Sequence, residues 1–338
     1  MVYVEKPTGE KEAKNTSLKE IVETANKSDY ARATETATLV REMLKEEKGR
    51  DAGLRMRGNL QYIPKGGNAI VVGDLHGDES SLVKILRETN FVDRVKKGER
   101  LTIVFLGDYI ENGPDSIEVL NTTLELKRNF RENVVMLRGD HELSPSSPNH
   151  PLSGHFLKQL MPGYEGSGKS INQAFFNMCN QKYGKLDSRM YEKYYEIFGT
   201  LPLAAKSENG ILFLHGGVSE KINEANLAYG GDDVERDIMW NEPRQSIRGT
   251  TSNSDRGMGL FFGEDILNEA LGNMSCKVLI RGHELVKSDM VYMFNGKLLT
   301  INSNAIIGRL AEKNFEVGYG YVSLENEVDD LSGAFHRS

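Results

Sequence analysis

Cysteine is scarce in this sequence, and long apolar runs are absent. The 338 residues include only two cysteines, Cys179 and Cys276, and these do not form a CxxC pair. This argues against a structural disulfide framework and against a cysteine-ligated zinc site. No segment approaches the roughly 20 apolar residues that a membrane-spanning helix requires, and the first residues lack the pattern of a secretory signal. We therefore expect a soluble, cytoplasmic protein.

Positive charge does not predominate either. Lys and Arg number 42 against 49 Asp and Glu, so the formal net charge is −7. A protein that binds nucleic acid or an anionic membrane surface usually has a basic face, so we expect neither as a partner. The 38% of hydrophobic and 27% of charged residues are typical of a globular chain that buries a large core.

What the sequence does contain is a recurrent pattern of short apolar runs that end in Gly together with Asp or His. The pattern occurs five times, as NAIVVGDLHG (68–77), RLTIVFLGDYIENG (100–113), NVVMLRGDHE (133–142), GILFLHGG (210–217) and KVLIRGHE (277–284). Runs of about four to six apolar residues are typical of strands buried on both faces. Helical patterns at 78–89 and 114–130 separate the first three runs. This alternation predicts an α/β fold.

The remaining segments indicate how the chain is organised. Residues 17–48 have a helical pattern interrupted near 26–28, and residues 170–198 carry aromatic side chains at helical spacing, which favours packing in the core. Residues 143–169 are rich in Ser, Pro and Gly, and the last residues are acidic and then polar. We expect an N-terminal helical extension (1–52), a main domain (53–325) with a loop insertion at 143–169, and a mobile C-terminal tail (326–338).

The five motifs also place possible metal ligands at strand ends. These ligands are Asp74, His76, Asp108, Asp140, His141, His215 and His283. A single His after a strand is more often structural than a ligand, but four of the seven histidines lie in these motifs. Carboxylates and imidazoles without thiolates favour Mn, Fe or Zn over Ca or Mg, and the set is large enough for two ions that share one carboxylate. Two such ions can stabilise the attacking and leaving oxygens of phosphoryl transfer.

In this order, the five motifs resemble the metal motifs of the phosphoprotein phosphatase (PPP) family of serine/threonine phosphatases, within the calcineurin-like metallophosphoesterases. DIMWNEP (237–243) resembles the Trp-containing turn of that family, and NSDRGMGLFFGEDILNEAL (253–271) resembles its phosphate-binding segment. The likeness covers roughly residues 35–142 and 170–305. It implies a sandwich of two mixed β-sheets flanked by helices, with residues 53–325 as the catalytic domain.

The resemblance also implies an activity and a role for each site residue. The family hydrolyses phosphoserine and phosphothreonine monoesters of proteins by direct attack of a metal-bound hydroxide, which implies two divalent ions, Mn first and Fe or Zn as alternatives. His141 would be the general acid, Glu111 would orient it, and Arg256 would hold the phosphate. The implied metal ligands are Asp74 and His76 for one ion, Asp108 as the bridge, and Asp140, His215 and His283 for the other.

Three features depart from the family pattern. Asp140 replaces the usual Asn of GNHE, so we expect tighter metal binding with less Lewis acidity for each ion. In GDYIENG, Glu111 replaces an Asp, and Asn112 stands at a phosphate-binding position where the family has Arg. Arg138 could contribute to phosphate binding, but its place in the motif suits a structural ion pair better. The insertion at 143–169 follows the expected acid directly, so we expect it to overhang the site as a lid.

Other functions remain open at this point. GYEGSGKS (163–170) matches the phosphate-binding loop of ATPases, but no buried strand leads into it, as that loop requires. The loss of one Arg and the insertion would also suit a dinucleoside polyphosphate hydrolase or another small-molecule phosphatase. A third possibility is a catalytically weak relative that binds phosphoproteins without turnover. The sequence does not identify a regulatory subunit.

Overall fold

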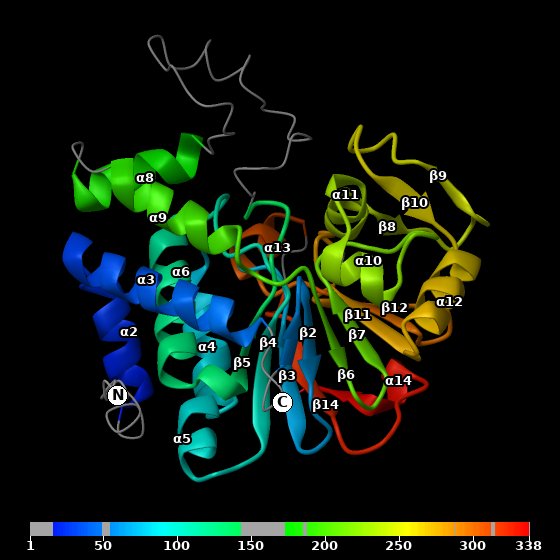
Figure 1. Ribbon diagram of the computed structural model, residues 1–338, viewed down its shortest axis with the longest axis horizontal. Helices are drawn as coiled ribbons and strands as arrows, with labels where there is room; N and C mark the ends of the chain where they lie inside the picture. Colours follow the sequence, from blue (N-terminus) through cyan, green and yellow to red (C-terminus); the bar gives the residue numbers. More distant parts are fainter. Residues whose placement is uncertain are drawn as a thin grey trace, which may run out of the picture.

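Two mixed β-sheets form the centre of the molecule, as the resemblance implied (Figure 1). The computed structural model describes residues 16–48, 55–142, 173–184, 188–286, 288–311 and 315–337. Three of the five apolar runs are parallel neighbours in a five-stranded sheet. Its order is β15 (Phe335–His336), β14 (Tyr319–Ser323), β3 (Asn68–Val72), β4 (Leu101–Phe105) and β5 (Val134–Met136).

The other two runs lie side by side in a seven-stranded sheet. Within it, β7 (Ile211–Leu214) is parallel to β11 (Val278–Arg281), and β11 is parallel to the next strand, β13 (Leu298–Ile301). The full order is β1 (Arg55–Arg57), β2 (Leu60–Ile63), β6 (Ala204–Ser207), β7, β11, β13 and β12 (Met290–Met293). The central strands of both sheets are buried throughout, which explains their continuous apolar runs.

The sheets pack face to face, and helices cover both outer faces. Val71 and Val104 of the first sheet share an inner cluster with Phe213 and Ile280 of the second. One outer face is covered by α2 (Leu18–Asn26), α3 (Tyr30–Glu47), α4 (Glu79–Glu88), α5 (Phe91–Lys96), α6 (Ser116–Asn129), α8 (Gln173–Tyr183) and α9 (Ser188–Phe198) (Figure 1). The other is covered by α10 (Glu224–Tyr229), α11 (Asp232–Trp240) and α12 (Glu264–Asn273).

The aromatic stripe of residues 170–198 packs in the core, as predicted. Phe175, Tyr194 and Phe198 are fully buried, and the ring of Phe175 contacts both others. In the predicted N-terminal extension, α3 is tied to α6 by the fully buried Lys127, whose Nζ lies 3.0 Å from Glu47. These helices share one hydrophobic cluster, so the described part of the extension is integrated into the fold.

The expectation of a mobile tail at 326–338 was wrong. The tail contains α14 (Leu331–Ala334), and β15 pairs with β14 to extend the five-stranded sheet. Leu331 and Phe335 supply the reason, because both are buried in the cluster between the sheets. Val328 is buried in the same cluster, so three apolar side chains in a polar segment are enough to anchor it. The insertion at 143–169, with the GYEGSGKS match, lies outside the described residues.

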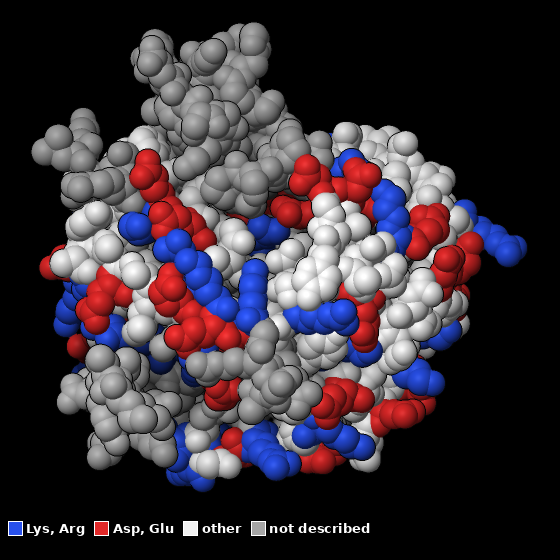
Figure 2. Space-filling view, in the orientation of Figure 1, with Lys and Arg blue, Asp and Glu red and all other residues white. Residues whose placement is uncertain are grey.

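The surface carries charges of both signs. On the face shown in Figure 2, Lys and Arg are interspersed with Asp and Glu. None of the helices within the described ranges has the length and apolar character needed to cross a membrane. A small third sheet, of β8 (Glu242–Pro243), β10 (Leu260–Phe262) and β9 (Thr250–Ser252), stands beside α11.

Asp78 joins two helices that begin near the strand ends. It caps α4 by accepting from the Ser81 amide at 3.0 Å, and it accepts from the amide of Ala305, the first residue of α13 (Ala305–Ala311), at 2.9 Å. We expect Asp78→Ala to lower the free energy of unfolding by about 1–3 kcal/mol, because it leaves buried amides without a partner. Urea denaturation would measure this loss.

A second cap provides the matched control for that experiment. Asp29 caps α3 at an exposed position, accepting from the Arg32 amide at 2.9 Å. Asp29→Ala should cost about 0.5–1 kcal/mol, because water can replace the lost acceptor. Equal losses in the two variants would contradict the role assigned to Asp78.

Candidate active site

The predicted ligands come together where the two sheets end. Asp74, Asp108 and Asp140 follow the parallel strands β3, β4 and β5, and His215 and His283 follow β7 and β11. The backbone turns sharply at these ends, since φ is 55° at Asp108 and 70° at His283. Left-handed backbone is uncommon outside glycine and often marks functional sites.

The glycines of the motifs make room for the carboxylates. A Cβ atom at Gly139 would lie 2.1 Å from Oδ1 of Asp108, and one at Gly282 would lie 2.2 Å from Oδ1 of Asp74. Because these distances are far below van der Waals contact, no larger residue fits without displacing a candidate ligand. Glycine in these two motifs is therefore a consequence of the close packing of the site.

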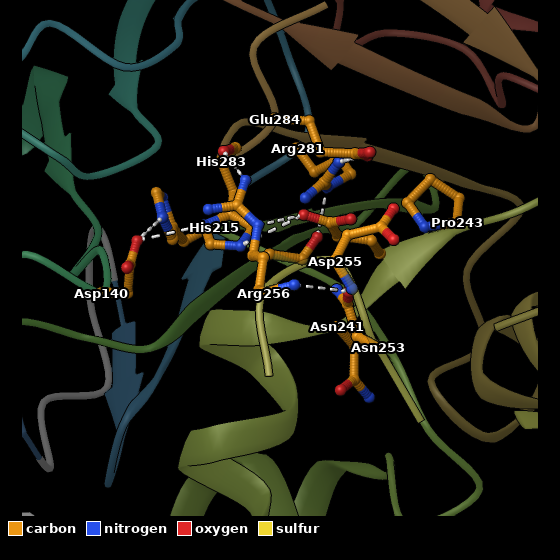
Figure 3. A network of polar contacts seen from close by, with 12 residues as sticks. Asp140, His215, Asn241, Pro243, Asn253, Asp255, Arg256, Arg281, His283 and Glu284 are labelled. Carbon is orange, nitrogen blue, oxygen red and sulfur yellow. Dashed lines mark hydrogen bonds and ion pairs between the residues drawn. The ribbon is translucent and has the colours of Figure 1, made fainter. Parts of the chain in front are cut away.

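Asp140, His215 and His283 form one buried group of possible ligands (Figure 3). Oδ1 of Asp140 lies 2.8 Å from Nε2 of His215 and 3.1 Å from Nδ1 of His283. Burial alone would raise the pKa of Asp140, but His283, His141 and His215 outweigh burial and hold it well below its usual range. The residue that replaces the family's Asn is therefore a carboxylate at neutral pH.

Asp108 belongs to two further groups. It lies with His76 and His141 in one, and with Asp74 and His215 in the other, with the ligand atoms of each group within 4.8 Å of one another. Its Oδ2 lies 3.2 Å from Nε2 of His76 and 3.5 Å from Nε2 of His215. This shared position is what a bridging ligand needs. Asp74 and His76, the expected ligands of one ion, lie in different groups around Asp108.

The electrostatics of this cluster fit a metal centre. Burial and repulsion from Asp140 and Asp74 raise the pKa of Asp108 well above its usual range. Several acids crowded in one buried place are unfavourable unless positive charge compensates them, and a divalent cation would supply it. The donors are carboxylate and imidazole groups, the combination that suits Mn, Fe or Zn.

Backbone carbonyls orient two of the imidazoles. Nδ1 of His76 lies 3.0 Å from the carbonyl oxygen of Ile110, and Nδ1 of His215 lies 3.0 Å from that of Leu106. Each bond places the proton on Nδ1 and leaves Nε2 as the lone-pair donor toward the cluster. His283 is turned the other way, because its Nδ1 faces Asp140 while its buried Nε2 has no hydrogen-bond partner.

His141 stands beside the cluster with its predicted partner. Its Nδ1 lies 2.5 Å from Oε2 of Glu111, and its Nε2 lies 3.9 Å from Oδ2 of Asp140. Burial would lower the pKa of His141, but Asp140 and Glu111 outweigh it and raise the pKa to about 9. In the metal-free protein the imidazole is therefore protonated on both nitrogens at neutral pH, with Nδ1 bound by Glu111 and Nε2 near Asp140.

The two predicted phosphate-binding residues contact different histidines of the site. Arg256 binds Glu242 through Nε and the carbonyl oxygen of His283 through Nη2, at 3.1 Å for the latter (Figure 3). Asn112 is beside His76, with its Nδ2 3.4 Å from Nδ1 of that ring. Arg138 is buried in an ion pair with Glu235 at 2.8 Å, the structural role that its place in the motif suggested.

Two acids of the site had no predicted role. Glu142, the last residue of RGDHE, accepts from the amides of Asp108 at 2.6 Å, Tyr109 at 2.9 Å and Gly139 at 3.0 Å. These hydrogen bonds connect the end of β4 to the end of β5. Glu242, within DIMWNEP, is buried beside Arg256. Both were in quoted motifs, but no sequence signal distinguishes a buried acid from a surface one.

Comparison with known protein families decides the class of this site. The calcineurin-like phosphoesterase family matches residues 68–287, a range that includes every predicted site residue. The chain is a calcineurin-like phosphoesterase. The match spans well over half of the chain, from the start of the first strand-end motif to just beyond the last one.

Related phosphoesterases include named serine/threonine phosphatases. The chain is 26% identical over 255 residues to the serine/threonine-protein phosphatase 6 catalytic subunit of Caenorhabditis elegans, which covers 73% of this chain and 67% of that protein. It is 28% identical over 246 residues to serine/threonine-protein phosphatase BSL2 of Arabidopsis thaliana, covering 69% of this chain but only 22% of that protein. These relatives confirm the predicted resemblance to the PPP family.

The fold agrees with a solved relative. The structure of a protein serine/threonine phosphatase from Saccharomyces cerevisiae, with similarity to human phosphatase PP5, superposes with a TM-score of 0.62 at 20% identity. The superposition covers 86% of this chain and 84% of that one. It supports the two-sheet sandwich of this phosphoesterase.

The contact between Glu111 and His141 can be tested in the metal-free protein. We expect Glu111→Gln to lower the pKa of His141 from about 9 toward its ordinary value, because the imidazolium loses one of its two nearest carboxylates. An NMR titration of the imidazole would measure the change. Glu118→Gln, which removes a carboxylate bound to Lys182, should leave the His141 titration unchanged. An unaltered titration in Glu111→Gln would contradict the pairing.

Proposed function

We propose that this phosphoesterase hydrolyses phosphoserine and phosphothreonine monoesters of proteins or peptides, using two divalent metal ions. The observation that carries the proposal is the buried carboxylate–imidazole cluster, with the His141–Glu111 pair and Arg256 beside it. The serine/threonine phosphatases among its relatives support a phosphoprotein substrate. We also propose a cytoplasmic location, on the basis of sequence composition alone.

The cluster divides into two sets of ligands in this proposal. Asp140, His215 and His283 would hold one ion, and Asp108 would link it to a second ion near Asp74 and His76. We propose Mn for both ions, with Fe or Zn as alternatives that the same ligands accept. When bound, the two ions would polarise the phosphoryl oxygens and make water a stronger nucleophile.

His141 is the general acid in this proposal. In the metal-free protein Asp140 and Glu111 outweigh burial and raise its pKa to about 9, and Glu111, which binds no ion in this proposal, would continue to favour the protonated ring that a departing serine or threonine alkoxide needs. Glu111 holds Nδ1 and thereby turns Nε2 toward the cluster, where a bound phosphate would lie. The glutamate is therefore an orienting group, and proton transfer falls to the imidazole.

Arg256 would bind the phosphoryl oxygens with its planar guanidinium. Asn112 takes the place of a second arginine and offers a neutral amide near His76. This lower positive charge also suits a second candidate, a hydrolase of dinucleoside polyphosphates or of other small phosphate esters. That substrate class would be favoured if a dinucleoside tetraphosphate were cleaved faster than a phosphopeptide.

The role of Asp140 can be tested by metal titration. Metal-stripped protein would be titrated with Mn²⁺ while hydrolysis of p-nitrophenyl phosphate is followed. We expect Asp140→Asn to bind Mn²⁺ about tenfold more weakly or worse, because a ligand charge is lost, and to turn over faster once saturated, because each ion stays more electrophilic.

The control is Asp93→Asn, the same substitution at an exposed residue of α5, which should behave as wild type. Two outcomes of this titration would contradict the proposals. Equal Mn²⁺ affinity in wild type and Asp140→Asn would remove Asp140 from the ligands. Absence of turnover in both, with a phosphopeptide and a dinucleoside tetraphosphate also uncleaved, would favour a phosphate-binding protein without activity.

Substitution of His141 separates turnover from binding. We expect His141→Asn to lower kcat by about 10²–10⁴-fold, because the leaving group loses its proton donor. Affinity for inorganic phosphate, measured by calorimetry, should stay close to that of wild type. His336→Asn, at an exposed residue of β15, is the matched control. Unchanged turnover in His141→Asn would show that another group supplies the proton.

A further inference from the structure

A row of alternating charges runs from the protein core to Arg256, and Figure 3 labels Arg281 and Glu284 at one end and Arg256 at the other. It begins at the fully buried Arg281, whose Nη1 donates to Glu284. Glu284 accepts in turn from Nη1 of Arg244 at 2.9 Å, and Nη2 of Arg244 donates to Oε2 of Glu242 at 3.1 Å. The other oxygen of Glu242 accepts from Nε of Arg256. We call these five residues the charge ladder.

Glu242 is the step of the ladder that contacts the active site. It is buried, and each of its carboxylate oxygens is bound by a different arginine. The oxygen that binds Arg256 also lies 3.8 Å from Nε2 of His283. A buried carboxylate needs such partners to remain charged, and their positions determine where it lies. The placement of Glu242 thus depends on Arg244 as much as on Arg256.

Several contacts hold the guanidinium of Arg244 in one position. Its guanidinium lies over the ring of Phe261 at 4.1 Å, and it also donates to the carbonyl oxygen of Pro243 at 3.0 Å. Asp255 is a further acceptor at 3.4 Å. Although the side chain is 33% exposed, both of its terminal nitrogens bind protein acceptors. It is therefore placed to orient its neighbours, with its terminal donors already in use.

Arg256 is held by Glu242 through Nε, and its only other side-chain hydrogen bond among the described residues runs from Nη2 to the carbonyl oxygen of His283. It lies between β9 and β10, and its side chain is 35% exposed. A long arginine side chain at the surface would otherwise sample many rotamers, which weakens any contact that it makes with a phosphate. With Asn112 in place of an arginine, Arg256 is the guanidinium to which the proposed function assigns the phosphate.

We propose that Arg244 is a positioning residue that, through Glu242, holds Arg256 in the orientation that binds the substrate phosphate. This inference rests on the proposed function. It makes affinity for phosphate depend on a residue that does not itself touch the substrate. A lysine at this position has no planar fork with which to bind Glu242 and Glu284 together, so it would replace Arg244 only in part.

The test compares phosphate binding and turnover in Mn²⁺-loaded variants. Arg244→Met should weaken binding of inorganic phosphate about tenfold and raise KM for p-nitrophenyl phosphate similarly, with a much smaller change in kcat. Arg244→Lys should fall between this variant and wild type. Bound Mn²⁺, measured by metal analysis, should be the same in all. Arg248→Met, at a 93% exposed arginine outside the ladder, should match wild type.

A double-mutant cycle distinguishes positioning from a general structural effect. If Arg244 acts through Arg256, then Arg244→Met should weaken phosphate binding little further once Arg256→Met is present. An equal loss in both backgrounds would overturn the inference, as would unchanged phosphate affinity in Arg244→Met. If that variant fails to fold, Arg244→Lys in the same cycle carries the test.

The failure of the proposed function would look different. Wild-type protein that cleaves no phosphoester but binds phosphate would overturn the proposed activity, while the phosphate measurements would still test Arg244. Wild-type protein that neither cleaves phosphoesters nor binds phosphate would overturn both. An active wild type with a fully active Arg244→Met variant would overturn only the positioning role.

Discussion

The crowding of three buried aspartates at the meeting edge of two sheets is the constraint on which the rest of this structure depends. Asp74, Asp108 and Asp140 lie where water is largely excluded, and their mutual repulsion would be unfavourable without histidines and without a cation. The remaining features of the site allow these side chains to lie close together in fixed positions. Glycines permit the close approach, carbonyls fix the imidazole tautomers, and left-handed residues turn the chain inward.

The two-layer architecture explains how distant segments supply one site. Parallel neighbours in each sheet end at the same edge, so residues far apart in sequence reach one place at the strand ends. The aspartates come from one sheet, and two of the histidines come from the other. The packing between β-sheets thus sets the distance from Asp140 to His215 and His283.

Most of the strand ends and candidate ligands could be predicted from the sequence, because burial and close packing restrict the residues at these positions. A strand buried on both faces must be continuously apolar, and a ligand beside another ligand needs glycine next to it, so each strand end left a readable motif. The contacts of Glu142 and of the charge ladder left none, since their partners are separated by up to 40 residues, as between Arg244 and Glu284. The tail was misjudged because its three buried apolar residues, Val328, Leu331 and Phe335, are too few to form a periodic pattern.

The hydrogen bonds of the Glu142 carboxylate do not depend on a metal ion, which affects what removal of the ions would do to the site. The carboxylate binds three backbone amides at the ends of β4 and β5, so these ends are joined by protein atoms alone. A chelator would therefore leave this link between the two strand ends in place, unlike small zinc domains that unfold when stripped. Exchange of bound ions would then be a local equilibrium, and the ion that occupied the site would reflect relative supply as much as ligand preference.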